Sequence, residues 1–140
     1  KSIQDFGVLP GNSPLLNSHN LQKAIDWASP KGAALYVEPS ETPYPINSGI
    51  ILKKNASLIG VHGPVGRGTG MLPDGNTPVG SVFAIEDDAA PFLTVEGATQ
   101  VRGIQFYYPN QEHKDPSKII EYPPTIRVSQ KEWVMPDILR

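Results

Sequence analysis

Two arginines near the end of the chain stand in similar short runs of apolar residues. We expect Arg102 and Arg127 at comparable places in successive coils of the chain, with Tyr107, Tyr108 and His113 on the adjacent loop. Guanidinium groups pair with anions, tyrosine rings offer flat faces for sugar rings, and tyrosine or histidine can transfer a proton. These residue types predict a patch that binds an anionic ligand. The alternatives are that exposed arginines only solvate this face and that the tyrosines pack their loop onto the strands.

Other residues that could do chemistry carry weaker signals. The acidic cluster Glu86-Asp87-Asp88 directly follows a predicted strand. Because adjacent positions on a strand point in different directions, we favour a solvated turn there over a calcium or catalytic site. The glycine-rich segment 66–70 lacks the lysine of a phosphate-binding loop, and the three histidines show no metal-ligand spacing. The absence of cysteine excludes disulfides and thiolate chemistry.

One helix and several short strands must position these residues. Leu21, Ala24, Ile25 and Ala28 repeat at helical spacing, with Asn17 or Ser18 as the expected N-cap and residues 29–32 as the stop. Short apolar runs predict strands at residues 34–37, 50–52, 57–61, 81–85, 92–95, 101–106 and 125–128.

The spacing of four runs suggests how the strands are arranged. Leu58, Val82, Ile104 and Ile126 are separated by 24, 22 and 22 residues. A repeat of this size, with one to three short strands in each coil, is typical of a parallel β-solenoid whose coils stack on a continuous core. An antiparallel sandwich with closely spaced strands is the alternative.

Composition excludes several classes of protein. The 140 residues include 15 prolines and 13 glycines, which interrupt long helices and rule out a helical bundle. The formal net charge of −2 gives no basic surface of the kind that binds nucleic acid or anionic membranes. No apolar run reaches the length of a membrane span, so we expect no membrane partner.

The first part of the chain resembles the N-terminal cap and first coils of the pectate lyase superfamily. The resemblance lies in the order and spacing of several pieces between residues 3 and 61. They are Ile3-Gln4-Asp5-Phe6-Gly7, the segments 21–28, 32–39, 44–46 and 50–52, and Asn55-Ala56-Ser57-Leu58-Ile59-Gly60. Residues 11–18 lack the acidic turn that usually precedes the helix in this family, which we interpret as altered capping.

The resemblance implies an all-β fold, a right-handed parallel β-helix with one short N-terminal capping α-helix. It divides the chain into a cap (1–33), coils (34–128) with long loops at 62–80 and 107–124, and a C-terminal tail (129–140). Since the coils would be capped at one end only, we expect either a longer parent protein or self-association through the open last coil. Trp133, Val134, Met135, Ile138 and Leu139 supply an apolar surface there.

The resemblance also implies an extracellular or periplasmic protein that binds, and in the parent cleaves, polysaccharide as a lyase or hydrolase. Arg102, Arg127, Tyr107, Tyr108 and His113 would then face a uronate. Calcium is expected only for a lyase, and no other cofactor is implied. No catalytic carboxylate motif occurs in the chain, so this segment alone is expected to be inactive. The alternative is a non-catalytic β-helix, a structural or glycan-binding module of the tailspike or adhesin type.

Overall fold

The computed structural model describes residues 1–61, 80–87, 89–109 and 125–128. Within them the chain forms the α-helix α1 (Pro14–Ala28), the 3-10 helices η1 (Ile3–Phe6) and η2 (Ser29–Lys31), and nine short strands. The strands are β1 (Ala34–Val37), β2 (Tyr44–Ile46), β3 (Ile50–Leu52), β4 (Ser57–Gly60), β5 (Val82–Ile85), β6 (Leu93–Val95), β7 (Gln100–Arg102), β8 (Gln105–Tyr107) and β9 (Ile126–Val128).

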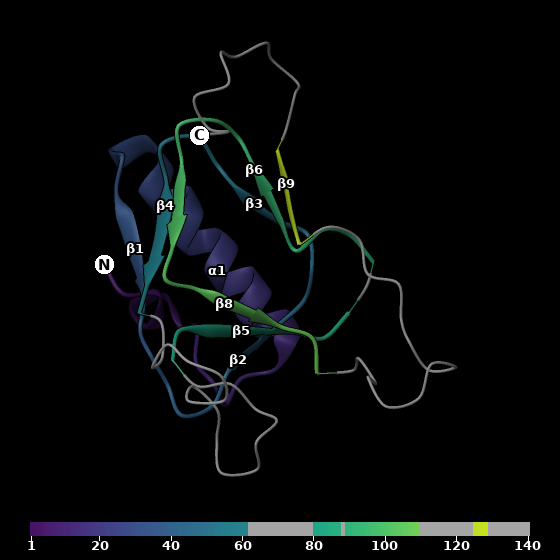
Figure 1. Cartoon of the computed structure of the whole chain (residues 1–140). Coiled ribbons are helices and arrows are strands. Elements are labelled where there is room, and N and C mark those ends of the chain that lie inside the picture. Colours follow the sequence, from purple (N-terminus) through teal and green to yellow (C-terminus); the bar gives the residue numbers. More distant parts are fainter. Residues whose placement is uncertain (62–79, 88, 110–124, 129–140) are drawn as a thin grey trace.

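All of these strands pair in parallel and form three three-stranded sheets. Sheet 1 has the order β1-β4-β7, sheet 2 the order β2-β5-β8 and sheet 3 the order β3-β6-β9. The chain therefore visits the three sheets in turn and then returns to the first, one strand further along (Figure 1). We call β1–β3, β4–β6 and β7–β9 the first, second and third strand triplets. The described part is thus all-β, apart from α1 and the two short 3-10 helices.

The sequence prediction located most strands but missed three features. The run at 101–106 is two strands, β7 and β8, because the chain turns a corner at Gly103, which has a φ of +69°. Strand β2 was not predicted, since a three-residue strand with a central proline has little β signal. Strand β8 also extends to Tyr107, which was expected in a loop.

The repeat that predicted a solenoid does not match the observed register. Leu58 lies in β4, Val82 in β5 and Ile126 in β9, which are strands of three different sheets. Ile104 lies between β7 and β8. Equivalent positions in sheet 1 are Leu35, Leu58 and Val101, 23 and 43 residues apart. The true repeat is uneven because residues 62–79, which lie outside the described part, separate β4 from β5. The parallel pairing was correctly predicted, but from residues that are not equivalent.

Aromatic side chains link the three triplets inside the molecule. Tyr44, Phe83 and Phe106 occupy equivalent positions of β2, β5 and β8. The rings of Tyr44 and Phe83 are 6.0 Å apart, Phe92 lies 5.4 Å from Phe83, and Phe106 lies 5.7 Å from Phe92. These tilted contacts add to the burial of apolar area, so the aromatic row is a main source of cohesion between neighbouring triplets.

The corner between sheets 1 and 2 requires small residues, because the backbones approach closely there. A Cβ atom on Gly103 would lie 2.1 Å from the carbonyl oxygen of Gly60, and one on Gly60 would lie 2.6 Å from the Cβ of Ser81. The buried Ser81 hydroxyl donates to the Val37 carbonyl (2.6 Å) and accepts from the Val61 amide (2.7 Å). Consecutive corners therefore stack directly on one another, with Ser81 bonding to Val37 in the preceding corner and to Val61 at the start of its own corner.

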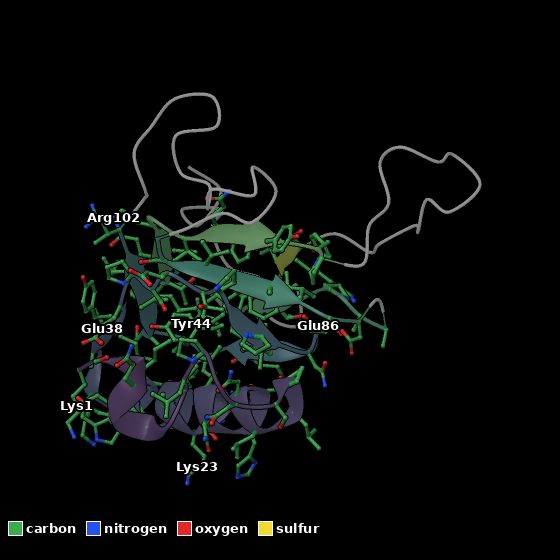
Figure 2. All side chains as sticks on the ribbon, turned by 90° about the horizontal axis from the view of Figure 1, so that it is seen from below. Lys1, Lys23, Glu38, Tyr44, Glu86 and Arg102 are labelled. Carbon is green, nitrogen blue, oxygen red and sulfur yellow. The ribbon has the colours of Figure 1, made fainter. Side chains whose placement is uncertain are left out.

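Helix α1 packs against the three strands of the first triplet. Figure 2 shows the helix at one end of the stack, with the strands of sheet 2 above it in successive layers. Its apolar face is formed by Leu21, Ala24, Ile25 and Ala28, all fully buried as predicted. The helix thus covers the apolar side chains of the first triplet.

Polar side chains of α1 bind the backbone of β2 and β3, whose outer edges have no strand neighbour in the described part. The Nδ2 of the fully buried Asn17 donates to the Pro45 carbonyl of β2 (2.8 Å). Gln22 accepts from the Ile51 amide of β3 through Oε1 (3.0 Å) and donates to the Ile51 carbonyl through Nε2 (3.0 Å). Gln22 therefore replaces the peptide group of a missing neighbouring strand.

The remaining strand, β1, is covered by the start of the chain. The Tyr36 amide donates to the Lys1 carbonyl (2.8 Å), and Ser2 forms a parallel bridge with Tyr36. The outer edge of each strand in the first triplet is therefore hydrogen-bonded. Side chains of α1 bind β2 and β3, and the start of the chain binds β1.

The N-cap of α1 is not Asn17 or Ser18, as the sequence analysis expected. The helix begins one turn earlier, where the Ser13 hydroxyl accepts from the Leu16 amide (3.2 Å) and Pro14 occupies the first position. A Ser-Pro pair suits this place because proline has a helical φ and no amide to satisfy. Asn17 is therefore free to bind β2.

We predict that Gln22→Ala lowers the free energy of unfolding by about 1 kcal/mol, because two hydrogen bonds to Ile51 are lost. Gln22→Glu should cost at least as much, since its carboxylate still accepts from the Ile51 amide but repels the carbonyl. Urea denaturation measures both, with Lys23→Ala on the exposed side of α1 as the control. A Gln22→Glu variant as stable as the wild type would contradict this role.

Tyr44 should make stability sensitive to alkaline pH. Its buried hydroxyl donates to the Glu38 carbonyl (2.7 Å) and accepts from Gln4 Nε2 (3.0 Å), and burial raises its pKa above the ordinary value of 10.0. The raised pKa stabilises the fold fully below pH 10.0, and this contribution is lost as the pH rises through the raised pKa.

We predict that Tyr44→Phe costs about 1–2 kcal/mol at neutral pH and loses less stability than the wild type above pH 10.0. Urea denaturation across this pH range measures the difference, and Tyr36→Phe, at an exposed tyrosine, is the matched control. Parallel pH profiles for Tyr44→Phe and the wild type would refute the prediction.

Candidate functional site

The residues predicted to bind an anionic ligand lie on different sheets. Arg102 is in β7 of sheet 1, opposite Ile59, and Arg127 is in β9 of sheet 3, opposite Thr94. Tyr107 is in β8 of sheet 2. The expectation that the two arginines occupy comparable places in successive coils is therefore wrong, because β7 and β9 belong to the same triplet and to different sheets.

Tyr108 has a structural position. It packs against the core, and its hydroxyl lies 2.5 Å from the Thr125 Oγ1, a contact that joins the end of β8 to the start of β9. His113 lies outside the described residues, as do Tyr122, the glycine-rich segment 66–70 and the apolar tail residues from Trp133 to Leu139.

The acidic cluster contributes a backbone contact. The Asp87 Oδ1 accepts from the Ser48 amide (2.8 Å), and the Glu86 amide donates to the Ile46 carbonyl (2.9 Å). Asp88 lies outside the described residues. Among those residues, no three histidine or acidic side chains come close enough to hold a metal ion together. Asp87 thus holds the turn between β2 and β3, a role that the sequence analysis did not predict, and the solvated turn favoured for residues 86–88 stays a prediction.

The outer face of sheet 1 combines an exposed aromatic ring with a cation in register. Tyr36, Ile59 and Arg102 are direct neighbours on β1, β4 and β7, and we call them the Tyr36 row. Tyr36 is 39% exposed, and Arg102 is exposed. Adjacent strands are about 4.8 Å apart, so the row extends over roughly 10 Å across the strands. Among the described residues, no carboxylate pairs with Arg102.

The second outward row of sheet 1 is small and polar. It consists of Ala34, Ser57 and Gln100, again in register on the three strands. The six outward positions of sheet 1 therefore hold no acidic side chain. This face has a flat ring, hydrogen-bonding groups and one positive charge.

The outer faces of the other sheets differ. On sheet 2, Ala84 is only 6% exposed and Val82 is fully buried, although neither belongs to the core cluster. On sheet 3, the row of Ile51, Thr94 and Arg127 contains a cation but no aromatic ring. Of the three sheets, sheet 1 thus has an accessible outer face that presents both an aromatic ring and a cation.

Sequence reasoning selected Arg102 but missed Tyr36. The run Ala34–Val37 shows no apolar and polar alternation in the sequence, and its alternation between exposed and buried positions, with Tyr36 on the exposed side, is visible only in the structure. Its register with Arg102 was not visible, because 66 residues separate the two positions.

Comparison of the chain with protein-family models, curated proteins and solved structures finds no match. Within the described residues, no helix is long and apolar enough to cross a membrane.

We predict that Asp87→Ala lowers the unfolding free energy by about 1–2 kcal/mol, because the Ser48 amide loses its acceptor. Asp87→Asn keeps an oxygen that can accept from the Ser48 amide, so its loss of unfolding free energy should be less than half that of Asp87→Ala. Thermal unfolding with either calcium or a chelator added should give the same midpoint for the wild type. A calcium-dependent midpoint lost in both variants would instead identify a metal site.

Proposed function

We propose that this chain is a segment of a right-handed parallel β-helix, related to the pectate lyase superfamily, that binds an acidic polysaccharide on the outer face of sheet 1. The rotation of the chain through three parallel sheets supports the β-helix assignment. Connections between parallel strands of one sheet are almost always right-handed, which supports the handedness. The cap-like position of α1 supports the relationship.

The Tyr36 row is the observation that carries the binding proposal. A tyrosine ring offers an amphipathic surface to one sugar ring, and a guanidinium group bonds to a carboxylate through two parallel hydrogen bonds. The row crosses β1, β4 and β7. A polymer that lies along the row, perpendicular to the strands, would therefore contact Tyr36 and Arg102 through different sugar units. A polymer of uronic acids supplies both the ring faces and the carboxylates.

Hydrolysis requires groups that the outer face of sheet 1 does not contain. Glycoside hydrolysis uses a pair of carboxyl groups, whereas the six outward positions of this sheet hold none. We therefore assign binding, and not hydrolysis, to this face. In a parent lyase or hydrolase, the catalytic groups and any calcium ion would lie elsewhere. Polysaccharide recognition would place the protein in an extracellular or periplasmic environment.

A non-catalytic structural module is the second candidate. Its support is that no strand of the described residues pairs with the free edges of β7, β8 and β9. Such edges can accept another strand, from a continuation of the stack or from a second copy. Glycan binding on sheet 1 is compatible with both candidates.

We predict that Arg102→Gln weakens binding to polygalacturonate about tenfold, because a charge-assisted hydrogen-bond pair is lost. Arg127→Gln, which removes the same charge from sheet 3, should change the affinity less than twofold. Isothermal titration calorimetry at fixed ionic strength measures both variants, and thermal unfolding confirms that they are folded.

Two further ligands separate recognition from simple charge attraction. Dextran, which has sugar rings but no carboxylates, and polyglutamate, which has carboxylates but no sugar rings, should both bind at least tenfold more weakly than polygalacturonate. Equal binding of polyglutamate, or equal losses for Arg102→Gln and Arg127→Gln, would refute the proposal.

A further inference from the structure

A cluster of two lysines and two aromatic rings lies where the chain begins and α1 ends. The Lys1 ammonium lies 5.4 Å from the centre of the Trp27 ring and 5.6 Å from that of Phe6. The Lys31 ammonium lies 5.2 Å from the centre of the same Trp27 ring. The Phe6 and Trp27 rings are themselves 5.4 Å apart. We call these four residues the Trp27 cluster.

The two ammonium groups of the Trp27 cluster have no negative partner within the described part of the chain. The ion pair there joins Lys53 to Asp26 (2.8 Å), on a different part of α1. Both lysines interact with Trp27, which is half-buried and packs against the core. Two positive charges held near one ring repel each other, and a nearby anion would reduce that repulsion. The cluster therefore has the charge and donors of an anion-binding site.

The position of the Trp27 cluster relates it to sheet 1. Ser2, next to Lys1, is the direct neighbour of Tyr36, so the start of the chain continues the Tyr36 row by one more position. Figure 2 shows Lys1 and Arg102 on the same side of the molecule, towards opposite ends of the stack. Three strand spacings separate the start of the chain from β7, or roughly 14 Å.

We propose that the Trp27 cluster is a second subsite for the acidic polysaccharide, which would run along sheet 1 from Arg102 to Lys1 and Lys31. This inference rests on the proposed function, since it extends the same binding face. A polymer held at two cationic points gains affinity from the linkage between them, whereas a single uronic acid can occupy only one. In Figure 2, Glu38 lies on the same side, between Lys1 and Arg102, and its negative charge opposes an anionic ligand there.

Trp27 also provides a direct signal for occupancy of this subsite. The chain contains two tryptophans, so Trp133→Phe leaves Trp27 as the sole indole. In this background, titration with a polygalacturonate oligomer should change the Trp27 emission in a saturable manner. Galacturonate monomer at the same carboxylate concentration should bind at least tenfold more weakly, and added salt should weaken oligomer binding.

Matched lysine variants test which positive charges contribute to oligomer binding. Lys31→Gln should weaken oligomer binding about fivefold, whereas Lys23→Gln, which removes an exposed charge from α1 outside the cluster, should leave it unchanged. Glu38→Gln should strengthen binding, because a repulsive charge on the binding side is removed. Circular dichroism and thermal unfolding establish that each variant is folded.

The outcomes distinguish this inference from the proposed function. An unchanged Trp27 emission together with calorimetric binding that depends on Arg102 would overturn the subsite and leave the Tyr36 row intact. An emission change that depends on Lys31 but not on Arg102 would refute the role of sheet 1 while retaining the cluster as an anion site. Equal losses for Lys31→Gln and Lys23→Gln would overturn the subsite.

Discussion

The fold depends on satisfying the backbone groups at the outer edge of its first three strands. A parallel strand without a neighbour presents unpaired amide and carbonyl groups that are costly to bury. Here Asn17 and Gln22 bind the backbones of β2 and β3, and the backbone of Lys1 and Ser2 pairs with β1. Side chains bind two of the strands and backbone binds the third, and in all three cases the edge groups are hydrogen-bonded. With that edge closed, α1 buries its apolar face on the first triplet, and the later strands pair on the opposite side.

The corners explain how the stack tolerates long insertions. At the junction of sheets 1 and 2, Gly60 and Gly103 allow two consecutive backbones to touch, and Ser81 bonds to Val37 of the preceding corner and to Val61 of its own. Register is thus fixed locally at this junction and does not require equal lengths of chain between strands. Residues 62–79 can consequently separate β4 from β5 while both strands keep their places. The outward residues of sheet 1 stay aligned for the same reason.

The sequence predicted individual elements better than their relationships. Short apolar runs located β1 and β3, and apolar periodicity located the buried face of α1, because local side-chain patterns determine them. The Ser13-Pro14 cap was missed because Asn17 and Ser18 are equally good capping residues, and only the tertiary contact with Pro45 shows that Asn17 is used elsewhere. The alignment of Tyr36 with Arg102 depends on two earlier pairings, β1 with β4 and β4 with β7, and uneven spacing conceals both.

The aromatic row has a consequence for how the molecule unfolds. In a stacked fold each unit touches only its neighbours, so cooperativity depends on the strength of the interfaces between successive units. Tyr44, Phe83, Phe92 and Phe106 form a continuous chain of contacts through these interfaces, which couples the melting of one unit to that of the next. Ile126, 41% exposed in β9, lies at the end farthest from α1. Fraying should therefore begin at that end and proceed towards the helix, with the aromatic contacts setting how far it spreads before the whole stack is lost.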